Sequence, residues 1–135
     1  MPKNLAKKPK NKYFIIEDDE LFADCIKSSI KKADKTGEIL YFKNCIDAIN
    51  SLLPPLPNLI FLDVLLPGPD GFTFLNEISS YVDTSKIPVV LVTSLKLADF
   101  DLNLYGIKGI LEKEEMEPKE IIDYVKRYSH PSNCS

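Results

Sequence analysis

Acidic, hydroxyl and ammonium side chains follow four of the apolar runs in this sequence. Four consecutive acids, Glu17 to Glu20, come directly after YFII, and Asp63 comes directly after LIFL. Thr93 follows VVLV, and Glu112-Lys113 follows the short run GIL. If these runs are parallel strands of one sheet, their carboxyl ends share the edge where ligands bind in open α/β sheets. We therefore expect several carboxylates, a hydroxyl and an ammonium to gather at that edge.

These residue types indicate a hard cation and phosphoryl chemistry. Closely packed carboxylates raise one another's pKa unless a cation lies between them. Lys113 supplies one positive charge, and a divalent ion would supply the rest. Carboxylate oxygens favour Mg2+ or Mn2+ over zinc, and the only histidine, His130, lies near the end of the chain. Because Mg2+ readily completes its shell with phosphate oxygens, we expect phosphoryl transfer with Asp63 as the nucleophile.

Most of these residues also have an ordinary structural interpretation. Asp18 or Asp19 is suited to cap a following helix. Thr93 is a common strand residue, and a lysine after a strand is usually solvated. Asp63 is harder to explain in this way, because a charge at the end of a buried strand must be compensated. The expected convergence favours the functional interpretation.

Five short apolar runs alternate with amphipathic stretches along the chain. The expected strands are 13–16, 39–42, 59–62, 89–92 and 109–111. Three of them are apolar throughout, which is typical of parallel strands covered on both faces. This alternation implies right-handed crossovers and a doubly wound sheet, for which two strand orders compete; the flavodoxin-like order fits five units best. We predict a flavodoxin-like, doubly wound α/β fold with a five-stranded parallel sheet in the order 2-1-3-4-5 and helices on both faces.

Helical spacing predicts the faces that pack on this sheet. In chain order the four expected faces consist of Leu21, Phe22, Cys25, Ile26, Ser29 and Ile30; Ile46, Ile49, Leu52 and Leu53; Phe72, Leu75, Ile78 and Val82; and Ile121, Ile122, Val125 and Tyr128. Asn44 is expected to cap the second helix, and Pro118 to open the last one. A further helix through Leu97, Phe100 and Leu104 has weaker spacing, because polar residues interrupt it.

Length and charge limit the class of protein. A chain of 135 residues fits one domain, which we place at 13–128 between a basic disordered tail, 1–12, and a C-terminal tail, 129–135. Without the five lysines of the first tail, the net charge changes from −3 to −8. An acidic body repels phosphate backbones, so we expect no direct binding of nucleic acid. The apolar runs are too short to span a membrane. Three scattered cysteines favour reduced thiols and the cytoplasm.

The pattern YFIIEDDE…NLIFLDVLLPGPDGF…IPVVLVTS…GIKGILEK resembles the receiver domain of two-component response regulators. The resemblance covers Tyr13 to about Tyr128, and its most specific part is the segment from Asp63 to Gly71. It implies a phosphoryl-accepting signalling switch with a chemotaxis-regulator-like fold rather than an enzyme in the usual sense. Its expected partners are a sensor histidine kinase or histidine phosphotransfer protein and a downstream protein target.

The resemblance assigns a role to each residue at the predicted edge. Glu17 and Asp18 match the acidic pair of the family, in which Asp18 would bind Mg2+ directly and Glu17 through water. Asp63 would be both phosphoacceptor and metal ligand, and the backbone carbonyl of Leu65 would be a further ligand. Thr93 matches the hydroxyl that moves toward the phosphoryl group. Lys113 matches the lysine that pairs first with the acceptor and then with the phosphate.

Two positions depart from the family pattern. Ile110 lies three residues before Lys113, where members with a rotating switch residue carry an aromatic side chain, and Glu114 replaces a common proline. We therefore predict that activation does not depend on aromatic rotation. Only seven residues follow Tyr128, so we expect output through protein–protein contacts or passage of the phosphoryl group along a relay.

Three other functions are compatible with parts of the pattern. Hydrolases of the haloacid dehalogenase type need a second aspartate two residues after the nucleophile, where this chain has Leu65. Flavodoxins bind a phosphate after the first strand, and Glu17 to Glu20 would repel it. The remaining alternative is a pseudo-receiver that acts as an interaction module without phosphorylation. It is disfavoured because no site residue is missing.

Overall fold

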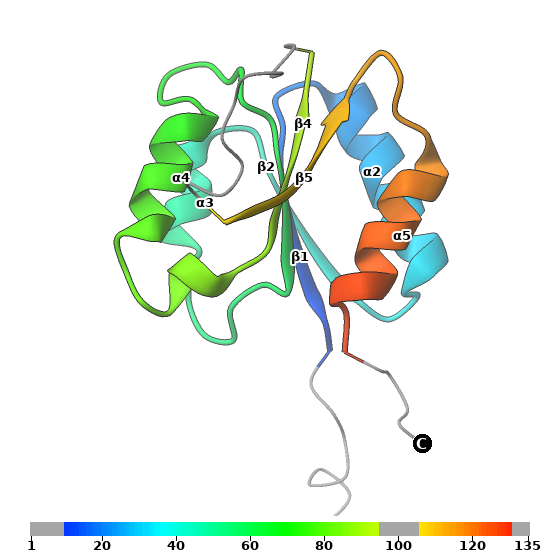
Figure 1. Cartoon of the computed structure of the whole chain (residues 1–135), viewed down its shortest axis with the longest axis horizontal. Coiled ribbons are helices and arrows are strands. Elements are labelled where there is room, and N and C mark those ends of the chain that lie inside the picture. The colour runs from blue at the N-terminus through cyan, green and yellow to red at the C-terminus, as the bar shows by residue number, and fades with distance from the viewer. Residues whose placement is uncertain (1–9, 95–105, 131–135) are drawn as a thin grey trace, which may run out of the picture.

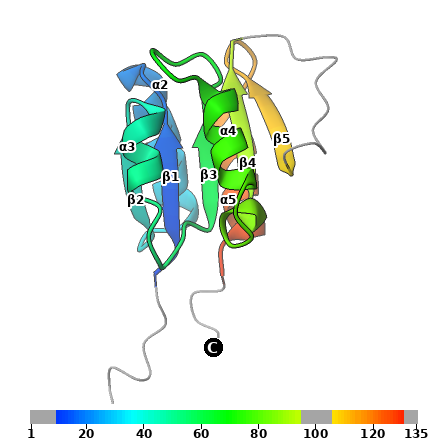
Figure 2. The same ribbon diagram turned by 90° about the vertical axis from the view of Figure 1, so that its left-hand side faces the viewer.

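The computed structural model describes residues 10–94 and 106–130. Five parallel strands form one sheet in the order β2-β1-β3-β4-β5, which Figure 2 shows from one face. The strands are β1 (Lys12–Ile16), β2 (Glu38–Phe42), β3 (Leu59–Leu62), β4 (Val89–Thr93) and β5 (Ile107–Glu112). This is the predicted flavodoxin-like order, and the fold prediction is confirmed.

Helices cover both faces of the sheet. Figure 1 shows one pair of helices on each face, with the described ends of the chain together at the bottom. The pairs are α2 (Glu20–Ala33) with α5 (Pro118–Tyr128), and α3 (Cys45–Asn50) with α4 (Gly71–Ser79). A single 3₁₀ turn, η1 (Thr84–Lys86), precedes β4. Near the bottom, the Asn11 side chain accepts from the backbone N–H of His130 at 2.9 Å, so the two ends are joined.

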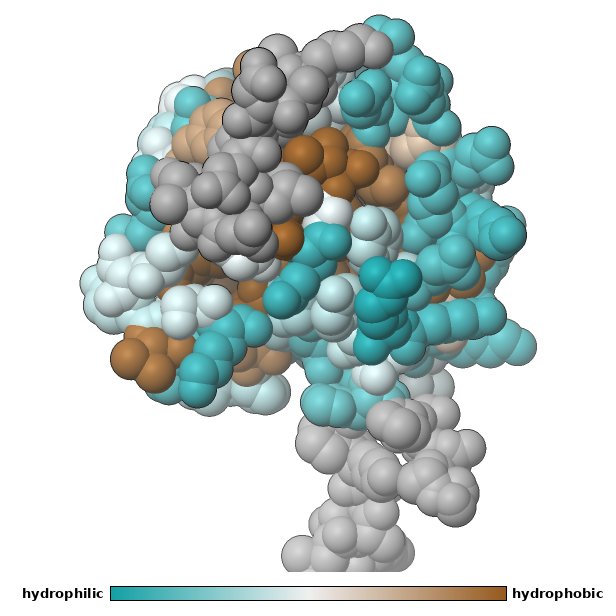
Figure 3. All heavy atoms as spheres, viewed as in Figure 1, coloured by the Kyte–Doolittle hydropathy of each residue, from teal (hydrophilic) through white to brown (hydrophobic). Residues whose placement is uncertain are grey.

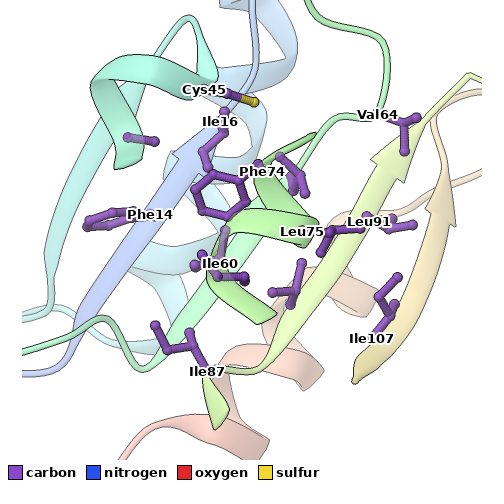
Figure 4. Close-up of a cluster of buried hydrophobic side chains, with 14 of the residues drawn as sticks. Phe14, Ile16, Cys45, Ile60, Val64, Phe74, Leu75, Ile87, Leu91 and Ile107 are labelled. Atoms are coloured by element: carbon purple, nitrogen blue, oxygen red, sulfur yellow. The ribbon is translucent and has the colours of Figure 1, made fainter. Parts of the chain in front are cut away.

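The strands are largely apolar because each of them contributes to two cores. In β1, Phe14 and Ile16 belong to the core under α3 and α4, and Ile15 belongs to the core under α2 and α5. This alternation is the two-residue period of a strand. Figure 4 shows the first core, where Phe74 and Leu75 of α4 pack over the sheet.

Local capping explains where the helices begin. Of the two candidate caps for α2, the structure has Asp19, whose carboxylate accepts from the backbone N–H of Leu21 at 2.9 Å. Asn44 caps α3 as predicted, by accepting from the N–H of Asp47. Pro118 occupies the first turn of α5, also as predicted. These signals could be identified in the sequence because each acts on the helix that begins at the next residue or at the signal itself.

Four apolar residues assigned to buried helix faces are exposed instead: Leu21, Ile46, Leu53 and Val82. Leu21 is 80% exposed because Ala23, Ile26 and Ile30 set the buried face of α2, and two residues rotate a helix by about 200°. In α3 the buried pair is Cys45 and Ala48, which directs Ile46 outward.

Leu53 and Val82 are exposed for a different reason: they lie beyond the ends of their helices. Helix α3 ends at Asn50 and α4 ends at Ser79, which leaves Leu53 and Val82 in the connections that follow. The further helix expected through Leu97, Phe100 and Leu104 lies outside the described residues.

The turn before α5 and the start of this helix are rich in acidic residues. Figure 3 shows hydrophilic side chains over the flank formed by α5 and the turn before it, where Glu114, Glu115, Glu117 and Glu120 are exposed. Within residues 10–94 and 106–130, no helix combines the length and apolar character needed to cross a membrane.

Candidate functional site

The carboxyl ends of β1 and β3 place Glu17 and Asp63 at the same edge of the sheet. The backbone N–H of Asp63 donates to the carbonyl of Ile16 at 2.9 Å, and the N–H of Glu17 donates to the carbonyl of Phe42 at 3.0 Å. The hydrogen-bond ladder thus continues one residue beyond the strands. The backbone of both acids is therefore fixed by the sheet. Each acid directly follows a run of buried apolar residues.

Three carboxylates converge at this edge. One oxygen from each of Glu17, Asp18 and Asp63 lies within 4.8 Å of the others. Glu17 and Asp63 are buried, at 1% and 3% exposure, whereas Asp18 is exposed. Such an arrangement needs positive charge, because like charges in a poorly solvated site repel one another strongly.

Lys113 supplies part of this charge from the end of β5. Its ammonium donates to Glu17 Oε2 at 2.9 Å and to Asp63 Oδ2 at 3.0 Å, and its side chain is 11% exposed. The backbone N–H of Lys113 donates to the carbonyl of Thr93 at 2.9 Å, which fixes its position beside β4. Burial alone would lower the pKa of Lys113, but the bonds to the two carboxylates outweigh burial and raise it. The lysine therefore stays charged.

One carboxylate oxygen of Glu17 accepts hydrogen bonds, and the other has no partner among the residues that the structure describes. Its Oε2 accepts from Lys113 and from the backbone N–H of Asp19, at 2.9 and 3.0 Å. Its Oε1 is buried and has no hydrogen-bond partner among the described residues. Burial raises the pKa of Glu17 to about 7, and the bonds from Lys113 and Asp19 oppose this rise. A buried, unpartnered carboxylate oxygen is suited to bind a cation or a water molecule.

The loop after β3 brings its backbone close to the acceptor. The N–H of Leu65 donates to Asp63 Oδ1 at 3.0 Å, while the Leu65 side chain is about half exposed. At Gly71, an added Cβ would lie 2.7 Å from the carbonyl oxygen of Asp63, so only glycine fits. Gly71 therefore lets the chain enter α4 tightly behind the acceptor.

Thr93 ends β4 at the same edge of the sheet. The residue is fully buried, and it lies opposite Glu112 in the register between β4 and β5. Strand β4 is also the neighbour of β3, which Asp63 directly follows. All the residues predicted to share the edge therefore lie there, on four of the five strands or directly after them.

The sequence analysis did not identify one neighbour of Lys113. The Lys113 ammonium lies 4.5 Å from the centroid of the Phe22 ring, in the first turn of α2. The helical pattern assigned Phe22 only to a packing face. Its spacing contains no signal for this contact, because the Lys113 side chain that makes it comes from the end of β5, far along the chain.

The donor set fits a hard divalent cation. Every member of the cluster offers a carboxylate oxygen, and the buried Oε1 of Glu17 adds an unpartnered acceptor. Mg2+ and Mn2+ prefer such ligands and use few protein groups, whereas zinc prefers cysteine and histidine. The residues that are present therefore fit the ion expected from the sequence.

Comparisons with known proteins agree with the geometry. The family model of the response regulator receiver domain matches residues 13–126. Response regulator PleD of Caulobacter vibrioides is 35% identical over 80 residues, which are 56% of this chain and 18% of PleD. This chain thus matches only a minor part of that larger relative.

Solved structures share the fold. The Mn2+-bound form of response regulator Rcp1 has a TM-score of 0.71 at 26% identity, over 88% of this chain and 91% of Rcp1. The receiver domain of sensor histidine kinase PA1611 from Pseudomonas aeruginosa, solved with magnesium in its active-site cleft, has a TM-score of 0.74 at 18% identity, over 89% and 98% of the two chains. With the family model matching most of its length, this chain belongs to the response regulator receiver domain family.

Proposed function

We propose that this receiver domain is a phosphoryl-accepting switch of a two-component or phosphorelay system, phosphorylated on Asp63. The main support is the buried Asp63 carboxylate, which lies 3.0 Å from the Lys113 ammonium and within 4.8 Å of the Glu17 and Asp18 carboxylates. Burying a carboxylate costs free energy even when it is paired, and ionisable groups buried in this way at a binding edge are concentrated at functional sites.

The proposed reaction needs few groups from the protein. One oxygen of Asp63 would attack the phosphorus of the donor. The new bond joins that oxygen to phosphorus, while the bond from phosphorus to the donor breaks and the leaving group takes the electron pair. Lys113 would hold its positive charge beside the transferring group, and the Thr93 hydroxyl would be drawn toward a phosphoryl oxygen.

We further propose that Mg2+, or Mn2+ in its place, is held by the carboxylates of Glu17, Asp18 and Asp63 and by the backbone carbonyl of Leu65. When bound, the ion would neutralise negative charge on the phosphoryl oxygens. The Mn2+-bound form of the similar regulator Rcp1 supports this assignment.

The proposed partners follow from the same function. A histidine kinase or a histidine phosphotransfer protein would donate the phosphoryl group in the cytoplasm, and a downstream protein would bind the phosphorylated form. The alternative is a pseudo-receiver that binds its partner without phosphorylation. Mass spectrometry of the intact protein after incubation with a small acyl phosphate and Mg2+ decides between them. The switch gains the mass of one phosphoryl group, and the pseudo-receiver does not.

Mg2+ affinity should depend more on Asp18 than on Glu17. The shorter Asp18 side chain keeps its carboxylate close to the strand end, and Glu17 already accepts bonds from Lys113 and Asp19. By calorimetric titration, we expect Asp18→Ala to weaken Mg2+ binding about ten-fold or more, which is about 1.4 kcal/mol. Glu17→Ala should weaken it less.

The control for this titration is Asp24→Ala, which removes an exposed aspartate from α2 and should leave the affinity unchanged. Because Glu17→Ala also removes a partner of Lys113, the pair Asp18→Asn and Glu17→Gln repeats the comparison with less change in shape. A larger loss for Glu17 in both pairs would reverse the proposed ranking.

Activation should need the Thr93 hydroxyl and not the Ile110 side chain. Ile110 is half-buried and packs on the core under α4, and it has no ring that could turn inward. A hydrogen bond to a charged group contributes about 1.5–3 kcal/mol. We therefore expect Thr93→Ala to reduce the population of the activated state about ten-fold or more, seen as loss of phosphorylation-dependent NMR shifts. Ile110→Val should keep these shifts, and equal losses in the two variants would contradict the prediction.

A further inference from the structure

The ammonium of Lys113 is enclosed by two carboxylates and one aromatic ring. Its Nζ donates to Glu17 and Asp63, and it lies 4.5 Å from the centroid of the Phe22 ring. An ammonium has three donors, and the two carboxylates use two of them. The ring covers part of the ammonium that water would otherwise solvate, in agreement with the low exposure of the Lys113 side chain.

We propose that Phe22 is a positioning residue for phosphoryl transfer, whose ring holds the Lys113 ammonium beside Asp63 through a cation–π contact. The inference rests on the proposed function, because it concerns the lysine of the phosphorylation site. Phe22 acts through Lys113 and does not touch the acceptor in this assignment.

The position of Phe22 in the chain suits this task. The ring lies in the first turn of α2, directly after the cap Asp19, whose N–H donates to Glu17. One short segment therefore carries two of the three carboxylates of the site, those of Glu17 and Asp18, and the ring that covers its cation. Because the helix start is fixed by its cap, the ring is attached to a rigid part of the site.

A ring holds the lysine in a way that a third carboxylate would not. A lysine side chain loses much rotamer freedom when it is fixed. Attraction to a ring face is strongest when the ammonium is shielded from water, and it imposes less direction than a hydrogen bond. The ammonium can therefore turn from Asp63 toward an arriving phosphoryl oxygen and keep its contact with Phe22.

The test compares three variants in phosphorylation by acetyl phosphate with Mg2+, followed by mass spectrometry of the intact protein. Phe22→Leu keeps an apolar side chain without a ring, and we expect the rate to fall about five-fold. Phe22→Tyr keeps the ring, and its rate should stay within about two-fold of wild type. Tyr124→Leu is the matched control, because it removes a ring that lies 5.3 Å from the Arg127 guanidinium on α5. Its rate should not change.

NMR spectra of the Lys113 side chain separate positioning from a general role in packing. The ring current of Phe22 should shift the Lys113 protons next to Nζ upfield; Phe22→Leu should lose this shift and Phe22→Tyr should keep it. A wild-type rate in Phe22→Leu, an equal loss in Phe22→Tyr, or the absence of the upfield shift would overturn the role of Phe22. If the wild-type protein itself accepts no phosphoryl group, the proposed function fails, and the role of Phe22 in transfer fails with it.

Discussion

Asp63→Asn should abolish phosphorylation of this protein by a small acyl phosphate with Mg2+. The Asp63 carboxylate lies at the end of β3, buried and bonded to Lys113 at 3.0 Å. An amide of the same shape carries no negative charge and is a poor nucleophile, so transfer to this position stops. The measurement is the gain of one phosphoryl mass in the intact protein, which should be complete in wild type and absent in the variant.

Asp70→Asn is the matched control for this experiment. Asp70 lies in the same loop and caps α4 by accepting from the N–H of Thr73. Asparagine caps a helix about as well as aspartate, so this variant should be folded and labelled like wild type. Undiminished labelling of Asp63→Asn would refute the assignment of the acceptor. Loss of labelling in both variants would indicate that the loop had been disturbed.

Lys113→Met should lower the stability of the fold more than any other single change considered for the site. The substitution keeps a long apolar stem and removes the charge that lies between the buried carboxylates of Glu17 and Asp63. Removing one partner of a buried ion pair costs about 3 kcal/mol, which for a domain of this size lowers Tm by roughly 10 °C. Thermal unfolding at pH 8 without divalent ions measures the loss.

The deficit of Lys113→Met should shrink at lower pH. Burial raises the pKa of Glu17 to about 7 in wild type, and loss of the bond from Lys113 raises this pKa further. A carboxyl group whose pKa is higher in the folded than in the unfolded state stabilises the fold at low pH, and this contribution disappears as the pH rises through the folded-state pKa. The gap in Tm should therefore be largest at pH 8 and clearly smaller at pH 5.5.

Lys43→Met is the control for the loss of a lysine. Lys43 pairs with Glu20, and both side chains are largely exposed, so water can replace the lost partner. Its Tm should change little at any pH. A deficit of Lys113→Met that is equal at pH 5.5 and pH 8 would show that lost packing, and not the buried charges, causes the instability.

The sequence by itself determined the sheet and the acidic edge. Strand β3 could be predicted at its observed bounds, because parallel strands covered on both faces must be apolar throughout. The flavodoxin-like strand order was predicted because it fits five strand–helix units better than the competing doubly wound order. Since Asp63 and Glu17 directly follow two neighbouring strands, their meeting at one edge required no knowledge of side-chain packing.

Helix faces were determined less well. Short stretches such as Cys45–Asn50 contain too few turns for a period to be read with certainty, so Ile46 was assigned to the core although it faces solvent. Small residues such as Ala23 and Ala48 occupy some of the buried positions. Hydrophobicity patterns favour larger side chains, so the prediction missed Ala23 and Ala48 and included Leu21 and Ile46, although residues such as Ile26 and Ile30 are buried as predicted.

Only the tertiary structure decided how the charges at the edge are arranged. It buried Glu17 and left its Oε1 without a partner among the described residues, and it placed the Phe22 ring over Lys113. The bond from Lys113 to Glu17 joins residues 96 positions apart. Contacts over such separations depend on how α2 and the strands are arranged in space, and this packing results from the fit of many side chains at once. A periodic pattern specifies which face of an element is buried, but it does not specify which side chain from a distant element that face will meet.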